Sequence, residues 1–439
     1  MNNLLTAALA ETLISCHPGD AERCEARRGA KDYFACLFPV LYGSVADSGL
    51  EPITRIFPAR HSKENLALRL GYISHALDFD DYHPAFRGHP TTVVLSALLA
   101  LSQSSPAVGI SAFLDAYVVG VELAGRLGKA IGTRHYSVGF HSTATLGTLA
   151  ATGAACRLLN LNVRSTQIAL GLAATQASGL RSQFGSAAKP LHAGLSARSA
   201  VNSVLLAQAG FGGQPDGVLE SFLQILGFDA AQPQKLLAEW GDPWRIVEPG
   251  LEFKRYPTCG GTHSAAEAAF VLRHQLEARG QGGVATVKRI EVSFPPGADT
   301  AANIIAPKNG VEARFSLEYV IADALINGSL ALENYTEAPV KADIAELAAR
   351  VTRHPDPRAP ADELDPDRRF HHLTLFLNDG SQLSHRVTRQ ETASAFTDVE
   401  AKLRNSLSVL PAHRAQGVIN DAQLQSDAAL HRLISLLGK

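Results

Sequence analysis

Cysteine is scarce in this chain of 439 residues, and none of its five cysteines belongs to a CxxC pair. Zinc ribbons and ferredoxin-type iron–sulfur clusters need closely spaced cysteines, so the sequence predicts neither. The odd number of widely separated cysteines favours free thiols in a reducing compartment over a framework of disulfides.

An excess of charge of one sign is also missing, because 40 Lys and Arg residues face 42 Asp and Glu residues. No basic block occurs, so we expect no nucleic-acid partner. No uncharged apolar run reaches the length of about eighteen residues that a membrane-spanning helix needs. The N-terminal residues lack a basic region and are soon followed by Asp20 and Glu22. They indicate an amphipathic helix instead of a signal peptide, and hence a cytoplasmic protein.

Helical patterns dominate residues 1 to about 245. Residues 110–132 repeat apolar side chains at i, i+3 and i+4, as a helix with a buried face does. Residues 145–159 are rich in Gly, Ala and Thr, and such small side chains let helices approach closely. We therefore expect a compact helical domain with residues 145–159 near its centre.

The pattern changes near Asp242-Pro243. Residues 287–295 alternate apolar and polar side chains, which predicts a strand, and residues 371–389 predict a hairpin that turns at Asn378-Asp379-Gly380. The Pro- and Asp-rich residues 353–367 predict a surface loop. The predicted fold is therefore mainly α, with an all-α helical domain (residues 1–245 and 400–439) and a smaller α+β domain (residues 246–399).

The most polar stretch in the helical part is HALDFDDYHPAFRGHPTTVV, residues 75–94. Up to position 89 it contains seven Asp, His and Arg side chains: His75, Asp78, Asp80, Asp81, His83, Arg87 and His89. Burying so many charges is costly unless each has a partner, and such clusters often have shifted pKa values at functional sites. The alternative is a solvated loop in which the aspartates cap the next helix.

Three further polar segments interrupt apolar sequence. His141 lies in GFHSTAT, where it either caps the following helix or takes part in catalysis. Residues 178–194, predicted to form a loop, contain Arg181, Lys189 and His192. Burial would lower the pKa of Lys189, which would suit a general base.

The last polar segment, EFKRYPTCGGTHS, contains Lys254, Tyr256 and Cys259 just before a predicted helix. The amide groups at a helix N-terminus favour anions, whereas Cys259 is best explained as a structural thiol. None of the polar segments has the spacing of a metal site, a GxGxxG fingerprint or a GxxxxGK[ST] loop. The residue types predict a site without metal or cofactor, in which cations neutralise carboxylates and a base removes an α-proton.

In their order along the chain, HALDFDD, GHPTT, GFHSTAT, LRSQFGSAAKPLHAG, FKRYPTCGGTHSA and RFSLEYVIADALINGSL resemble the MmgE/PrpD family. This family includes 2-methylcitrate dehydratase, cis-aconitate decarboxylase and iminodisuccinate epimerase. The resemblance implies a helical domain with a smaller α+β lid domain, a homodimer, and activity without an iron–sulfur cluster.

The resemblance also implies which residues act. The expected catalytic residues are Asp78, His89, His141, Lys189 and Lys254. The expected substrate-binding residues are Tyr82, Arg87, Arg181, His192, Tyr256 and Tyr319. Two of these depart from relatives: Tyr82 stands where decarboxylase members have threonine, and Arg181 where several dehydratase-like members have an acidic residue.

We therefore predict a cofactor-independent lyase that dehydrates a 2-methylcitrate-like hydroxy-polycarboxylate. Lys189 or His141 would be the base, and His89, oriented by Asp78, would be the acid. Lys254 and Arg87 would hold carboxylates of the di- or tricarboxylate substrate. The alternatives are an epimerase of an amino- or imino-dicarboxylate, a cis-aconitate-type decarboxylase, and a binding protein without catalysis.

Overall fold

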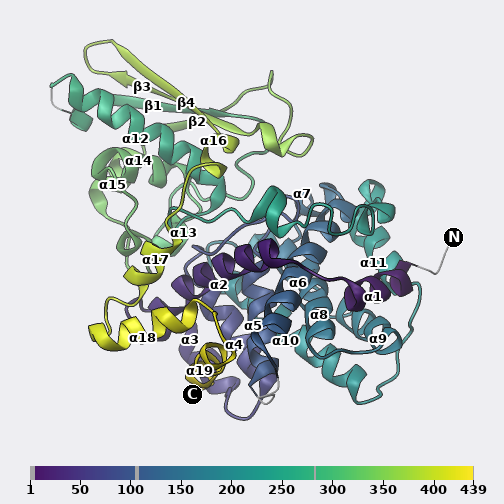
Figure 1. Ribbon diagram of the computed structural model, residues 1–439. Coiled ribbons are helices and arrows are strands. Elements are labelled where there is room, and N and C mark those ends of the chain that lie inside the picture. The colour runs from purple at the N-terminus through teal and green to yellow at the C-terminus, as the bar shows by residue number, and fades with distance from the viewer. Residues whose placement is uncertain (1–4, 104–107, 281–282, 439) are drawn as a thin grey trace. The chain divides into compact units, whose positions relative to one another are not determined.

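The computed structural model describes residues 5–103, 108–280 and 283–438, and the chain divides into two compact units (Figure 1). The first unit contains the chain up to Ser182, Ala187–Phe253 and the chain from Asp398. The second unit contains Gln183–Ser186 and Lys254–Thr397. Within the described part of the chain, no helix is both long and apolar enough to cross a bilayer.

The first unit is helical. Its helices are α1 (Leu5–Ser15), α2 (Asp20–Leu41), α3 (Leu50–Ile56), α4 (Lys63–His75), α5 (Pro90–Ser102), α6 (Ile110–Ile131), α7 (Arg134–Ser137), α8 (Ser142–Leu158), α9 (Val163–Ala174), α10 (Ala188–Gln208), α11 (Val218–Gly227), α17 (Val399–Ser406), α18 (Ala412–Ala422) and α19 (Asp427–Leu437). Every residue of α8 from Ser142 to Cys156 is buried, which confirms the central place expected for this Gly-, Ala- and Thr-rich segment.

Helices α4 and α10 approach each other through glycine. A Cβ atom at Gly71 of α4 would come within 2.9 Å of the carbonyl oxygen of Ala193, and one at Gly194 of α10 within 2.4 Å of that of Leu68. Only residues without a side chain allow this backbone approach. The contact lies about one helical turn from His75, at the end of α4, and from Lys189, at the start of α10.

The second unit is α+β. It contains α12 (His263–Ala278), α13 (Gly310–Ala313), α14 (Leu317–Asn327), α15 (Ala342–Ala348), α16 (Arg389–Ala393), β1 (Val287–Phe294), β2 (Val351–Pro355), β3 (Phe370–Leu377) and β4 (Gln382–Thr388). The strand order is β2-β1-β3-β4, with β1 parallel to β2 and antiparallel to β3. Helix α12 packs on β3 and β4 (Figure 1). The mainly α fold with a smaller α+β part is thus confirmed.

The strands that were predicted from periodicity are present. Ile290, Val292 and Phe294 of β1 are buried, and β3 and β4 form the hairpin that turns at residues 378–380. The loop predicted for residues 353–367 was wrong at its start, because Arg353 to Pro355 pair with β1 as part of β2. An edge strand tolerates proline at its end, since the outer side needs no amide donor.

The loop predicted for residues 178–194 was wrong in its second half. Helix α10 already begins at Ala188, so Lys189 and His192 are helical. Pro190 lies in the first turn of this helix, where a backbone N–H would have no intrahelical partner and proline is therefore tolerated.

Candidate functional site

The polar stretch between α4 and α5 is buried, not solvated. The exposed fraction of His75, Asp78, Asp80 and Asp81 does not exceed 3%, and that of His89 is 7%. Asp78 has a φ of 50°, a left-handed conformation that aspartate adopts more readily than most residues but that still needs support from its surroundings. The loop is thus held in a defined shape by the helices around it.

A chain of hydrogen bonds connects the loop to α10. The Lys189 ammonium group lies 2.9 Å from Oδ1 of Asp78 and 2.8 Å from Nε2 of His75. An ammonium group can only donate, so Nε2 of His75 accepts and its Nδ1 carries the proton. This Nδ1–H faces both carboxylate oxygens of Asp80 at 2.9 Å. Hydrogen bonds thus connect the four residues in the order Asp80, His75, Lys189, Asp78.

His89 precedes α5, whose first residue is Pro90. Its Nδ1 lies 2.7 Å from the carbonyl oxygen of Asp81 and 3.3 Å from Oδ2 of Asp80. Its Nε2 lies 3.7 Å from Oδ1 of Asp78, which is within ion-pair distance but too long for a hydrogen bond. The closer contacts that orient His89 therefore come from Asp80 and from the backbone at Asp81.

His141 joins the same group from the start of α8. Its ring is stacked on that of His75, with 6.1 Å between the centroids. Its Nδ1 lies 3.1 Å from Nδ1 of His192, one turn after Lys189 on α10. The ring of Tyr82 approaches His89 edge-on at 6.0 Å. We call His75, Asp78, Asp80, His89, His141, Lys189 and His192 the histidine–lysine cluster.

Burial shifts the titration of this cluster. It lowers the pKa of His75 to about 3 and that of His192 to about 4, and it also lowers the pKa of His141, in each case with help from the charge of Lys189. Burial alone would raise the pKa of the Asp80 carboxyl, but its contacts with His75 and His89 bring it well below the usual range. At neutral pH the imidazoles of His75, His141 and His192 are therefore neutral, whereas the Asp80 carboxylate is ionised.

The cluster also has the spacing of a metal site. His75, Asp78, Asp80 and His89 each offer one ligand atom, and these atoms lie within 4.8 Å of one another. However, the Lys189 ammonium group binds Oδ1 of Asp78 and Nε2 of His75, two atoms that these residues could offer to a metal. A side-chain cation therefore competes with a metal cation for these donors.

Two predicted substrate-binding arginines lie around another aromatic ring. The guanidinium of Arg181 lies 4.3 Å from the ring centroid of Tyr136, and that of Arg87 lies 5.7 Å from it. Arg181 also donates to the carbonyl oxygen of Ser137 at 3.1 Å. Among the described residues, neither Nη2 of Arg87 nor Nε of Arg181 has a hydrogen-bond partner, although both atoms are buried.

The remaining predicted residues belong to the second unit. Lys254 is the first residue of its main segment. The hydroxyl of Tyr256 donates to Glu267 at 2.6 Å. Tyr319 is part of the hydrophobic core of this unit, and its hydroxyl accepts from the amide of Lys341 at 3.3 Å. Tyr256 and Tyr319 thus have structural contacts of their own.

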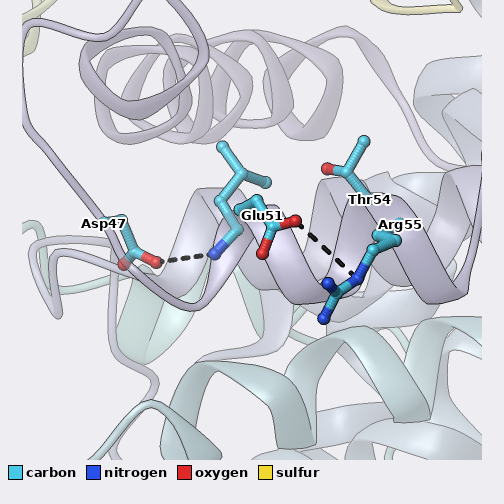
Figure 2. A pocket seen from close by; sticks show the side chains of 5 residues that line it. Asp47, Glu51, Thr54 and Arg55 are labelled. Carbon is cyan, nitrogen blue, oxygen red and sulfur yellow. Dashed lines mark hydrogen bonds and ion pairs between the residues drawn. The ribbon is translucent and has the colours of Figure 1, made fainter.

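A separate surface pocket of about 440 Å³ lies beside α3 (Figure 2). Its charged side chains already have partners. Asp47 accepts from the amide of Leu50 at 3.1 Å and from the hydroxyl of Tyr72 at 2.6 Å, and Glu51 pairs with Arg55 at 3.7 Å. With its charges paired in this way, the pocket resembles a capped helix start more than a reaction site.

Some residues of the site had no role in the sequence prediction. His75 and Asp80 link Lys189 to the loop. The only sequence feature that pointed to them was their position in the polar stretch 75–94. Asp32 of α2 and Lys402 of α17 form an ion pair beside this loop, with 2.7 Å between Oδ1 and Nζ. No local pattern in the sequence marks that pair.

Comparison with known proteins shows which family the chain resembles. The N-terminal domain of the MmgE/PrpD family matches residues 46–230, and its C-terminal domain matches residues 256–426. Similar curated proteins include the cis-aconitate decarboxylases of Mus musculus (29% identical over 331 residues) and Homo sapiens (29% over 325), as well as that of Aspergillus terreus (28% over 340). Each alignment covers 72% of this chain. It covers 65%, 66% and 68% of the three relatives, so the chain spans slightly less than two thirds of the first two.

Proposed function

Because the chain belongs to the MmgE/PrpD family, we propose that it is a lyase that dehydrates a 2-methylcitrate-like hydroxy-polycarboxylate. The observation that carries this proposal is the buried hydrogen-bonded chain that runs from Asp80 through His75 and Lys189 to Asp78. The neutral ring of His141 is stacked against His75 in this chain. Neutral imidazole and fixed ammonium are the groups that proton removal next to a carboxylate needs.

In the proposed reaction, His141 takes the proton from the carbon next to a substrate carboxylate. The electron pair of that C–H bond forms a carbon–carbon double bond, and the hydroxyl on the neighbouring carbon leaves with a proton from His89 as water. Of the two bases suggested by the sequence, His141 fits better, because Lys189 already donates to Asp78 and His75. Lys189 would instead stabilise the negative charge that develops on the substrate.

Arginines suit the substrate carboxylates. The partnerless buried atoms of Arg87 and Arg181 support their use as carboxylate ligands, since a guanidinium binds a carboxylate through two parallel hydrogen bonds. Tyr82 and His192 contact His89 and His141 and would line the same space. Roles for Lys254, Tyr256 and Tyr319 rest on the family resemblance.

Decarboxylation of cis-aconitate is the second candidate, because the curated relatives carry that name. That reaction breaks a carbon–carbon bond, releases CO2 and adds a proton to the remaining carbon, so it needs an acid but no α-proton removal. Tyr82 argues against it, since decarboxylase members have threonine there.

One experiment separates the candidates. The protein is incubated in D2O with 2-methylcitrate, cis-aconitate and a panel of hydroxy- and amino-dicarboxylates, and products are followed by proton NMR and by CO2 release. We expect a new alkene from a hydroxy-polycarboxylate. Release of CO2 from cis-aconitate would replace our proposal by decarboxylation, and deuterium exchange without loss of water would replace it by epimerisation. The absence of all three reactions would refute the lyase.

A further inference from the structure

We propose that Lys402, on the C-terminal segment of the chain, is a positioning residue that fixes the loop carrying Asp78 and Asp80 without touching the substrate. The activity part of this inference rests on the proposed function. The geometric part does not, and it can be tested by itself.

The contacts of Lys402 are all made by its ammonium group. Helix α17 packs on α2, and Figure 1 shows the two side by side. From there Lys402 Nζ donates to the carbonyl oxygen of Phe79 at 2.6 Å and to Oδ1 of Asp32 at 2.7 Å. It also lies 3.7 Å from the centroid of the Phe79 ring. Phe79 stands between Asp78 and Asp80, so this side chain binds the backbone between the two carboxylates.

The loop requires such support. Asp78 has a left-handed φ of 50°, and a backbone in this region persists only when neighbouring groups hold it. The cluster depends on the same few residues, because Asp78 accepts from Lys189, Asp80 accepts from His75, and the Asp81 carbonyl orients His89. A loop that relaxed would therefore move three groups of the site at once.

Stability alone does not explain the pair of Lys402 and Asp32. Their side chains are 7% and 1% exposed, and a buried ion pair is often no more stable than an apolar pair of similar volume. Burial lowers the pKa of Lys402, but the charge and the hydrogen bond of Asp32, together with the charge of Asp80, outweigh burial and keep the ammonium form. The carbonyl contact with Phe79 is what an apolar pair could not supply.

The chain offers a matched control. Lys31 of α2 pairs with Glu400 of α17, so it connects the same two helices close to Lys402. Within the part of the chain that the structure describes, its ammonium group contacts Glu400 and not the loop, and the Glu400 side chain is 39% exposed. A variant of Lys31 therefore shows how weaker contact between α2 and α17 changes stability and activity when the contact with Phe79 is kept.

The test compares Lys402→Met, Lys402→Met with Asp32→Asn, Lys402→Arg and Lys31→Met. We expect kcat to fall by about 10²-fold in the first two, the effect of a misplacement of about 1 Å in a catalytic group, with KM changed much less. The double variant removes both buried charges, so its melting temperature should recover towards that of the unmodified protein while its kcat stays low. Lys402→Arg should restore part of kcat, and Lys31→Met should retain all of it.

A measurement without substrate tests the geometric part of the inference independently of the proposed function. Nitrogen-15 NMR of the imidazoles reports which ring nitrogens of His75 and His89 carry a proton. We expect both signals to shift in the double variant and to stay unchanged in Lys31→Met. If the double variant keeps the unmodified signals and the unmodified kcat, Lys402 is only a structural clamp and the inference is wrong. If the unmodified protein turns over none of the substrates, the proposed function fails, and the NMR comparison still decides this inference.

Discussion

Lys189 donates a hydrogen bond to Asp78 over 2.9 Å, although 111 residues separate them in the sequence. The bond joins the start of α10 to the loop after α4. Both partners are buried, so each compensates the charge of the other. If the proposed function holds, variants at either position should change both stability and activity, so both are measured.

Replacement of Lys189 by Met should lower kcat by roughly 10²–10⁴-fold, because it removes a cation positioned next to the reacting carboxylate. It should also destabilise the first unit by about 3–5 kcal/mol, since Asp78 is left buried without its ammonium partner. Lys189→Met with Asp78→Asn should regain stability but not activity. Denaturant unfolding and steady-state kinetics check both parts, with Lys235→Met, at an exposed position, as the control. Full turnover by Lys189→Met would remove this residue from the mechanism.

Replacement of His141 by Gln should also lower kcat by roughly 10²–10⁴-fold while the protein remains folded, because the proposed general base is lost. Added imidazole should restore part of the rate if the remaining space admits it. The control is His135→Gln, a buried histidine that contacts Thr145 of α8 but lies outside the cluster. Equal losses in both variants would mean that damage to α8, and not loss of a base, explains the effect.

Chelator should leave the activity unchanged. Lys189 binds Oδ1 of Asp78 and Nε2 of His75 and supplies a cation to the site, so a chelator should remove nothing from it. Dialysis against EDTA followed by kinetics tests this, together with metal analysis of the purified protein. Loss of activity that returns on adding one equivalent of zinc or iron would show that His75, Asp78, Asp80 and His89 hold a metal after all.

Stability should fall as the pH falls below about 6.5, and His371 of β3 shows why. Burial, assisted by Arg369 and Arg353, lowers its pKa to about 3, whereas the value in the unfolded chain is 6.5. Between these two values the unfolded chain binds a proton that the folded chain does not. The full contribution is thus present above pH 6.5 and is lost by about 1.4 kcal/mol per pH unit towards pH 3.

Unfolding by urea at pH 7 and at pH 5 measures this dependence. In His371→Gln the free energy of unfolding should differ less between the two pH values. The decrease equals the contribution of one titrating histidine. The control is His274→Gln, which replaces a histidine with a side chain 79% exposed on α12. If His371→Gln retains the full difference, the acid sensitivity comes from other buried groups, such as His75 and His192.

The sequence predicted the elements that follow from local pattern. The hairpin of β3 and β4 was predictable because alternating residues flank Asn378-Asp379-Gly380, and the loop after α4 because its charges interrupt apolar helices. The loop predicted for residues 178–194 extended past the start of α10 and included Pro190, although the first turn of a helix accepts proline. Lys402 could not be predicted, because its contacts with Asp32 and Phe79 cross more than 300 residues and no periodicity records them.

The first unit is discontinuous in sequence, and this has a consequence for the order of synthesis. A ribosome completes Lys254–Thr397, the whole main segment of the second unit, before it reaches α17. Until then the loop at Phe79 lacks its ammonium anchor, and Asp32 lacks the cation that compensates its burial. A nascent chain can therefore form the second unit early, but the histidine–lysine cluster gains its last support only when α17 has left the ribosome. The first unit is therefore completed last, although its first residues are synthesised before the second unit.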